Sequence, residues 1–244
     1  TKRFEMSNIA LIFAGGSGKR MNTVSKPKQF LELRGKPIII YTLELFDNHP
    51  MIDGIVISCI EKWIPYLEKL IKKFCISKVK AIVPGGDTGQ DSIYNGLETA
   101  KDLFTMDCSI LIHDGVRPLI NEKTITDNVE SVLNYGSCIT CIPATETFIV
   151  CNLEGLIDIP SRKDSLIARA PQSFLLQDIL SAHRRAQSEG RHDFIDSCSM
   201  MNYYGYKLHT IVGPVENIKI TTPTDFFIFR ALVDVHENQQ IFGF

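Results

Sequence analysis

The chain has 244 residues, of which 26 are Lys or Arg and 28 are Asp or Glu, so its net charge is −2. This balance argues against a general nucleic-acid binder, which usually presents a basic face, and no stretch approaches the roughly 20 apolar residues of a membrane span. No signal-peptide pattern precedes the first predicted strand. We therefore expect a cytoplasmic protein that has neither a nucleic acid nor a membrane as a partner.

Short apolar runs alternate with amphipathic segments through the first 143 residues. Strands are predicted at 8–14, 54–60, 78–83, 109–113 and 137–143, and helices open at 35–37 and span 61–74, about 93–101 and 121–133. This repetition is typical of a mostly parallel, twisted sheet flanked by helices, with right-handed crossovers. We therefore predict an α/β fold in which residues 1–244 form a single domain.

The alternation stops after residue 143. Two β-type runs at 147–152 and 156–159 flank a turn and predict a hairpin. Because a hairpin that leaves a parallel sheet needs a surface to pack on, we interpret residues 144–170 as a projecting β-arm that embraces a second subunit. Helices at 176–189 and 194–204, strands at 207–212 and 217–221, and a helix capped by Thr222 and running to about residue 235 complete the chain.

A glycine-rich loop follows the first predicted strand. It contains Gly15, Gly16 and Gly18, and four cations follow within ten residues: Lys19, Arg20, Lys26 and Lys28. Glycines let backbone N–H groups approach an anion closely, so this loop predicts a phosphate site. It is neither a Walker A loop nor a dinucleotide fingerprint, because Phe13 and Met21 stand where those patterns require glycine.

Two further polar loops follow predicted strands, at residues 85–89 and 114–117. The carboxyl ends of parallel strands meet at one edge of a sheet, so we expect these loops to converge with the first. Asp114 is then a candidate Mg²⁺ ligand and Arg117 a candidate for a second phosphate; the alternative is an Asp–Arg pair that braces a turn. His113 is interpreted as a packed residue, whereas His183 and its neighbouring arginines are interpreted as surface.

Six motifs in order carry a family resemblance: AGGSGKRM, KPKQF, GGDTGQDS, HDGVRP, PQSF and NIKITTPTD. Together they resemble the cytidylyltransferases that make CDP-alcohols, which include enzymes for 2-C-methyl-D-erythritol 4-phosphate and for ribitol 5-phosphate. The resemblance implies a Rossmann-like nucleotidyltransferase domain, a homodimer joined through the β-arm, CTP and a polyol phosphate as substrates, and Mg²⁺ as cofactor.

The same resemblance assigns roles to individual residues. The expected catalytic residues are Arg20, Lys28 and Lys219. The residues expected to bind CTP are Ala14, Gly15, Gly16, Gly18, Gly86, Asp87 and Ser92. The residues expected to bind the polyol phosphate are Asp114, Arg117, Thr147, Arg162 and Lys219, with Thr147 and Arg162 serving the partner subunit's site and Asp114 also holding the metal ion.

Two departures from the family pattern stand out. Thr88 and Gly89 replace the usual Glu or Asn and Arg, so no arginine is expected in that loop. Ala170 stands where the family usually has a Thr that contacts the alcohol substrate, so the acceptor pocket is expected to differ. The arm carries Ile159, Pro160, Ser161 and Arg162, similar to the Ile-Pro-Asn-Arg of ribitol-type enzymes. We therefore expect ribitol 5-phosphate as the acceptor. The alternatives are 2-C-methyl-D-erythritol 4-phosphate as acceptor and, in another class, a nucleotide-binding module without catalysis.

Overall fold

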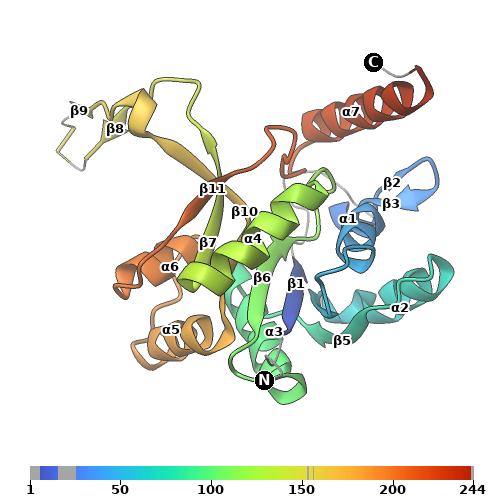
Figure 1. The fold of residues 1–244 in the computed structure, drawn as a ribbon, viewed down its shortest axis with the longest axis horizontal. Coiled ribbons are helices and arrows are strands. Elements are labelled where there is room, and N and C mark those ends of the chain that lie inside the picture. Colours follow the sequence, from blue (N-terminus) through green and yellow to red (C-terminus); the bar gives the residue numbers. More distant parts are fainter. Residues whose placement is uncertain (1–5, 16–25, 153, 156, 243–244) are drawn as a thin grey trace.

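A computed structural model describes residues 6–15, 26–152, 154, 155 and 157–242. Its centre is a seven-stranded sheet in the order β11-β7-β10-β6-β1-β4-β5 (Figure 1). Strand β1 pairs in parallel with β4 and β6, β4 with β5, and β7 with β11. The strands are β1 Asn8–Ala14, β4 Gly54–Cys59, β5 Val79–Pro84, β6 Ser109–Asp114, β7 Ser137–Pro143, β10 Leu166–Leu175 and β11 Thr210–Val212. The predicted α/β fold with a mostly parallel sheet is confirmed.

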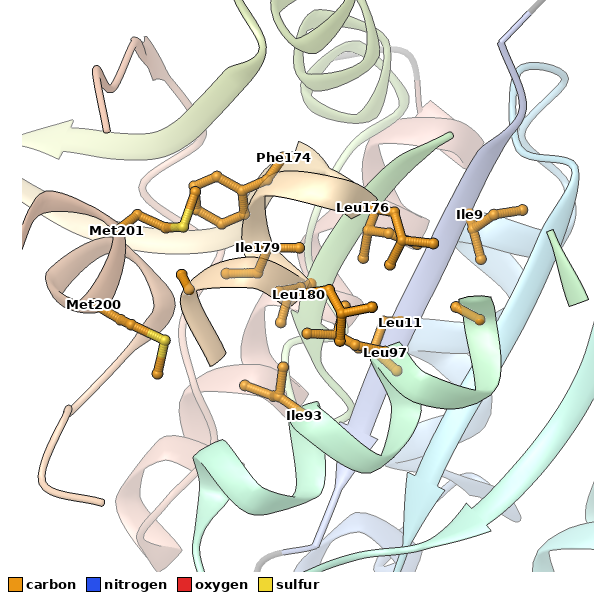
Figure 2. Packing of buried hydrophobic residues seen from close by; sticks show 14 of the residues in the cluster. Ile9, Leu11, Ile93, Leu97, Phe174, Leu176, Ile179, Leu180, Met200 and Met201 are labelled. Carbon is orange, nitrogen blue, oxygen red and sulfur yellow. The ribbon is translucent and has the colours of Figure 1, made fainter. Parts of the chain in front are cut away.

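Helices cover both faces of this sheet (Figure 1). The side chains of β1 alternate between the two layers, with Ile9 and Leu11 in one apolar cluster and Ala10 and Ile12 in the other. Figure 2 shows the first cluster, where Leu11 lies beside Leu97 of α3 and Leu180 of α5, and where Met200 and Met201 of α6 lie at the opposite end. The helices are α1 Ile38–Asp47, α2 Ile64–Lys73, α3 Gly89–Leu103, α4 Glu122–Tyr135, α5 Leu176–Ser188, α6 Ser197–Tyr203 and α7 Pro223–Phe242. Helices α3, α5 and α6 pack on one face, and α1, α2 and α4 on the other.

The strand β10 was not predicted. It runs antiparallel between β6 and β7, and its register shifts between Ala168, which faces Cys141, and Gln172, which faces Ile139. Residues 169–171 therefore form a β-bulge opposite one residue of β7. Pro171, which cannot donate to a ladder, and the polar residues around it hide this strand from a search for apolar alternation.

The strand predicted at 217–221 is wrong. This segment has no regular structure and is held by single contacts, such as the hydrogen bond from the Ile220 N–H to the Val116 carbonyl. The surface assignment of His183 is also wrong, because its ring is 1% exposed and stacks on Tyr94. The predicted cap of the last helix is confirmed: Thr222 Oγ1 accepts from the Asp225 N–H at 3.3 Å.

A separate two-stranded ladder forms the tip of the arm. Strands β8, Val150–Cys151, and β9, Ile157–Asp158, pair antiparallel, and Figure 1 shows them projecting from the body of the domain. The predicted hairpin is therefore confirmed, with shorter strands than expected. Its exposed apolar side chains include Ile149, Val150, Ile157 and Ile159. A third short ladder joins β2, Glu32–Leu33, to β3, Lys36–Pro37, just before α1.

Short 3₁₀ helices lie at Lys28–Phe30 (η2), Glu61–Trp63 (η3) and Arg162–Asp164 (η4). Within the part of the chain that the structure describes, no helix combines the length and apolar character needed to cross a membrane.

Gly96 lets α3 lie close against the sheet. A Cβ at this position would sit 3.0 Å from Ser58 Oγ and well inside van der Waals contact with the fully buried Leu11 side chain. Because neither neighbour has space to retreat, we expect Gly96→Ala to destabilise the protein by about 1–3 kcal/mol, measured by urea denaturation.

The sign of this effect is informative, because Gly→Ala within an unhindered helix usually stabilises a protein. The double variant with Leu11→Val, which trims the clashing side chain, should cost less than the sum of the two single changes. Additive costs, or a stabilising Gly96→Ala, would contradict the close packing described here.

Candidate active site

The end of β1 meets the start of α3 around a single hydroxyl group. Ser92 Oγ donates to the Thr88 carbonyl at 2.9 Å and accepts from the Gly86 N–H at 3.0 Å. A Cβ on Gly15 would lie 2.9 Å from the same oxygen. Glycine at position 15 therefore lets the first loop pack directly against the second.

The structure thus brings four of the predicted CTP-binding residues together: Ala14, Gly15, Gly86 and Ser92. Ser92 is 2% exposed and its hydroxyl is fully engaged, so it positions the backbone of Gly86 in this structure. Asp87 is exposed in the same loop. The predicted residues Gly16, Gly18 and Arg20 lie outside the described residues. The role of the group in CTP binding stays a prediction.

A buried amide fixes the segment that carries Lys28. The Gln29 side chain, 1% exposed, donates from Nε2 to the Ala14 carbonyl at 2.7 Å. This bond holds η2 beside the carboxyl end of β1, and Lys28 is itself 9% exposed there. Lys26 points elsewhere: its ammonium pairs with Glu32 at 3.0 Å and lies over the Tyr66 ring.

Asp114 lies between two cations at the carboxyl end of β6. Its Oδ2 accepts from Arg117 Nε at 2.7 Å, and its Oδ1 accepts from Lys219 Nζ at 2.7 Å. Burial alone would raise the pKa of the Asp114 carboxyl, but the charges and hydrogen bonds of Arg117 and Lys219 outweigh it and hold that pKa well below its usual range. Asp114 is therefore an anion at any physiological pH.

His113 does not take part in proton transfer at this position. Its Nε2 lies 3.1 Å from the Arg117 carbonyl, which can only accept, so Nε2 carries the proton. Burial lowers the pKa of the imidazole to about 4 despite this hydrogen bond, and the ring packs against Phe46. The interpretation of His113 as a packed residue is confirmed.

A cavity of about 220 Å³ adjoins the Asp114 cluster. Asp114, Arg117 and Lys219, three residues predicted to bind the polyol phosphate, line it together with Ala170. Thr147 and Arg162 do not: both are exposed on the arm and neither lines the cavity of its own chain. Their expected contribution to a partner subunit's site stays a prediction.

Sequence reasoning missed three residues that shape this cavity. Arg169 and Gln172 line it from the bulge of β10. Gln172 Nε2 donates to Asp196 Oδ2 at 3.0 Å and ties the bulge to the start of α6. Asn217 joins the bulge to the charged cluster, because its Nδ2 donates to the Ala170 carbonyl at 2.6 Å while its own carbonyl accepts from Arg117 Nη1 at 2.8 Å. Gln172 and Asn217 lie inside the recognised motifs, which was the available signal.

Asp114 is the candidate metal ligand, and it stands alone. No group of three or more His, Cys, Asp or Glu side chains suited to a metal ion occurs among the residues that the structure describes. Mg²⁺ is commonly held by one or two carboxylates with the remaining ligands from substrate phosphates and water. The site therefore fits a cation that arrives with a polyphosphate, for which Asp114 supplies one oxygen in competition with Lys219.

Comparisons with known proteins agree with one another. The family model described as 2-C-methyl-D-erythritol 4-phosphate cytidylyltransferase matches residues 8–234. A ribitol-5-phosphate cytidylyltransferase of Vibrio parahaemolyticus is 54% identical over 97% of this chain and 100% of its own. A 2-C-methyl-D-erythritol 4-phosphate cytidylyltransferase of Clostridium botulinum is 37% identical over 93% and 97%. The crystal structure of 4-diphosphocytidyl-2C-methyl-D-erythritol synthase from Anaerococcus prevotii has the same fold, with a TM-score of 0.81, 23% identity and coverage of 94% and 96%.

The Asp114 cluster generates a stability prediction. Asp114→Asn would leave the nearly buried Arg117 guanidinium without its counter-ion, and breaking a buried pair in this way costs about 3–5 kcal/mol. Urea denaturation of the purified variant near pH 7 measures this loss.

Glu98→Gln is the matched control, because it removes a carboxylate that bonds Arg184 and Lys101 at the surface. We expect it to cost less than about 1 kcal/mol. Equal effects of the two substitutions would show that burial of the Asp114 pair has no energetic consequence.

Proposed function

The chain belongs to the 2-C-methyl-D-erythritol 4-phosphate cytidylyltransferase family, and we propose that it transfers the cytidylyl group of CTP to an alditol phosphate, with ribitol 5-phosphate as acceptor. The observation that carries the proposal is the Asp114, Arg117 and Lys219 cluster beside a cavity at the carboxyl end of the sheet. Ligands of open α/β sheets bind at this edge.

The chemistry requires charge and position more than acid–base catalysis. The second pKa of a phosphate monoester is about 6, so near pH 7 the acceptor is largely a dianion and needs no general base. One of its oxygens attacks the α-phosphorus of CTP in line. The new phosphorus–oxygen bond forms as the bond to the β-phosphate oxygen breaks, and diphosphate leaves with that electron pair, giving the CDP-alditol.

Three cations, Lys28, Arg117 and Lys219, have a place in this scheme. Lys219 and Arg117 border the cavity, where they can bind both the acceptor phosphate and the α-phosphate. Lys28, held beside β1 by the Gln29 bond, is assigned to the triphosphate. Such fixed donors stabilise the charge that moves toward the leaving diphosphate in the transition state. Asp114 orients the two cavity cations and keeps them from repelling each other.

A divalent cation such as Mg²⁺ fits the proposed reaction. When bound, it would neutralise phosphate charge, with Asp114 as the protein ligand. The in-line displacement itself depends on the cations of the chain and on the alignment of the two substrates.

The choice of acceptor rests on relatedness and on the arm. The ribitol-5-phosphate cytidylyltransferase of Vibrio parahaemolyticus is more similar to this chain than the 2-C-methyl-D-erythritol 4-phosphate cytidylyltransferase of Clostridium botulinum, and the arm sequence around Arg162 resembles the ribitol-type form. A diphosphate-release assay with CTP, Mg²⁺ and a panel of alditol phosphates tests the proposal. Faster release with 2-C-methyl-D-erythritol 4-phosphate would favour that alternative, and tight CTP binding without release for any acceptor would favour a non-catalytic module.

We also propose a homodimer in which the arm completes the partner's site. The arm carries exposed apolar side chains at Ile149, Val150, Ile157 and Ile159, and an exposed apolar patch on a projecting hairpin favours burial against another chain. Thr147 and Arg162 lie on this arm, away from the cavity of their own chain.

Two lysine substitutions test the catalytic roles. Lys28→Ala and Lys219→Ala are each expected to lower kcat by at least about 10²-fold, the scale of a lost transition-state donor. Lys26→Ala is the control, since the Lys26 ammonium is engaged with Glu32 and Tyr66, and it should keep turnover close to that of the unmodified protein. Near-normal turnover of either test variant would contradict its assigned role.

Mixing two inactive variants tests the shared site. If Arg162 acts in the partner's cavity, a mixed dimer of Lys219→Ala and Arg162→Ala contains one site with both defects and one intact site. Random exchange of subunits should then restore about a quarter of the unmodified activity. If Arg162 acts within its own chain, or not at all, mixing restores nothing beyond the activities of the two separate variants.

A further inference from the structure

Three residues that line the cavity each carry a buried polar atom that has no hydrogen-bond partner within the protein. Within the described residues, Arg169 Nε, Gln90 Oε1 and Ser197 Oγ are buried and have no hydrogen-bond partner. Gln90 is 7% and Ser197 2% exposed. The three come from β10, α3 and α6, and all line the same cavity.

Leaving such groups unpaired is costly. Each buried polar atom without a partner destabilises the fold by about 1–3 kcal/mol. Of the seven such atoms among the described residues, three belong to residues that line this one cavity. The three also differ in chemistry: the Arg169 guanidinium donates, Gln90 Oε1 accepts and a hydroxyl such as that of Ser197 does both. A ligand that satisfies them must itself carry donors and acceptors, as a polyol does.

Arg169 lines the cavity from an irregularity in the sheet. Arg169 is the first residue of the β10 bulge. In a regular strand, alternation would fix the direction of its side chain, and the bulge removes that constraint. The bulge is anchored on both sides, by Asn217 to the Ala170 carbonyl and by Gln172 to Asp196. Since bulges often re-aim a side chain next to an active site, this anchoring gives Arg169 a fixed direction.

The charge around Arg169 suits an anion. Among the described residues no carboxylate pairs with its guanidinium, and burial together with the Arg117 charge lowers its pKa. The cavity is lined by three cations, Arg117, Arg169 and Lys219, and by two carboxylates. Asp114 is shared by two of those cations, and Asp196 accepts from the neutral groups of Gln172 and Ser199. One positive charge thus stays uncompensated.

The size of the cavity also limits the ligand. At about 220 Å³ it is smaller than the roughly 300–1,000 Å³ of sites for drug-sized ligands, so it suits a small polyol phosphate better than a nucleoside triphosphate.

We propose that Arg169, Gln90 and Ser197 form the subsite that recognises the acceptor, with Arg169 binding its phosphate beside Arg117 and with Gln90 and Ser197 binding hydroxyl groups of its carbon chain. This inference rests on the proposed function and adds to it the residues that select the acceptor. The side chain of Ala170 has no polar atom, so neighbouring side chains must form the hydrogen bonds to the acceptor.

The test separates acceptor binding from CTP binding. The variants are Arg169→Met, Gln90→Met and Ser197→Ala, with Arg184→Met, which removes a surface arginine bonded to Glu98, as control. KM for ribitol 5-phosphate, KM for CTP and kcat are measured for each, and calorimetry measures ribitol 5-phosphate binding directly. Thermal melting shows that each variant is folded; Arg169→Met should melt no lower than the unmodified protein, since it removes a half-buried charge that has no carboxylate partner among the described residues.

We expect Arg169→Met to raise KM for every alcohol phosphate by about 10- to 100-fold, the scale of a lost hydrogen bond to a charged group, with little change in KM for CTP. Arg169→Lys should recover part of this loss. Gln90→Met and Ser197→Ala should weaken the binding of ribitol 5-phosphate more than the binding of 2-C-methyl-D-erythritol 4-phosphate, because the latter has fewer hydroxyl groups. Arg184→Met should change none of these values.

Other outcomes overturn one or both proposals. Unchanged acceptor KM values in an active enzyme would overturn the subsite and leave the proposed function standing, as would losses confined to CTP. An unmodified protein that binds ribitol 5-phosphate through these residues without releasing diphosphate would support the subsite and overturn the proposed activity. An unmodified protein that neither turns over nor binds ribitol 5-phosphate would overturn both.

Discussion

The carboxylate of Asp114 holds together parts of the chain that are about a hundred residues apart in sequence. It bonds Arg117 on one side and Lys219 on the other, and Arg117 continues the connection to the Asn217 carbonyl. Without the Asp114 carboxylate, the charges of Arg117 and Lys219 would repel each other in this partly desolvated site and destabilise the position of the 217–220 segment. One buried anion therefore fixes both the end of β6 and a segment that has no regular structure of its own.

The antiparallel strand β10 gives the site its second wall. A sheet with parallel strands alone would have presented loops and helix starts at this edge, as the side formed by β1, β4 and β5 does. By inserting β10 between β6 and β7, the chain brings the bulge with Arg169 and Ala170, and Gln172 just after it, next to the Asp114 cluster. The two substrates proposed for this protein thus face differently built walls, one made of glycine-rich loops and one of an anchored strand.

Local sequence signals explain which features were predictable. The strands β1, β4, β6 and β7 are short, mostly apolar runs that are almost entirely buried, and the edge strand β5 is a short apolar run that is half-buried. Polar loops that follow such strands lie at one edge of the sheet, so Asp114 and Arg117 could be predicted. The strand β10 is hidden because Pro171 and polar neighbours interrupt its apolar alternation. The segment from Asn217 to Thr221 has the alternation of a strand, but it is not one, because no neighbouring strand pairs with it in the sheet. The sequence gives no sign that Arg169 lines the cavity, because its position depends on a register shift of β10 against β7. His183 was misjudged because two arginines beside it suggested solvent.

The position of β10 in the chain also has a consequence during synthesis on the ribosome. Strand β6 ends at Asp114 and β7 ends at Pro143, but the strand that pairs with both is not complete until Leu175. At about 5–20 residues per second, the facing edges of β6 and β7 stay unpaired for several seconds of translation. Open strand edges of this kind are templates for association between nascent chains. Because Lys219 emerges later still, a growing chain can form the loops that follow β1 and β5 well before Asp114 has both of its cationic partners.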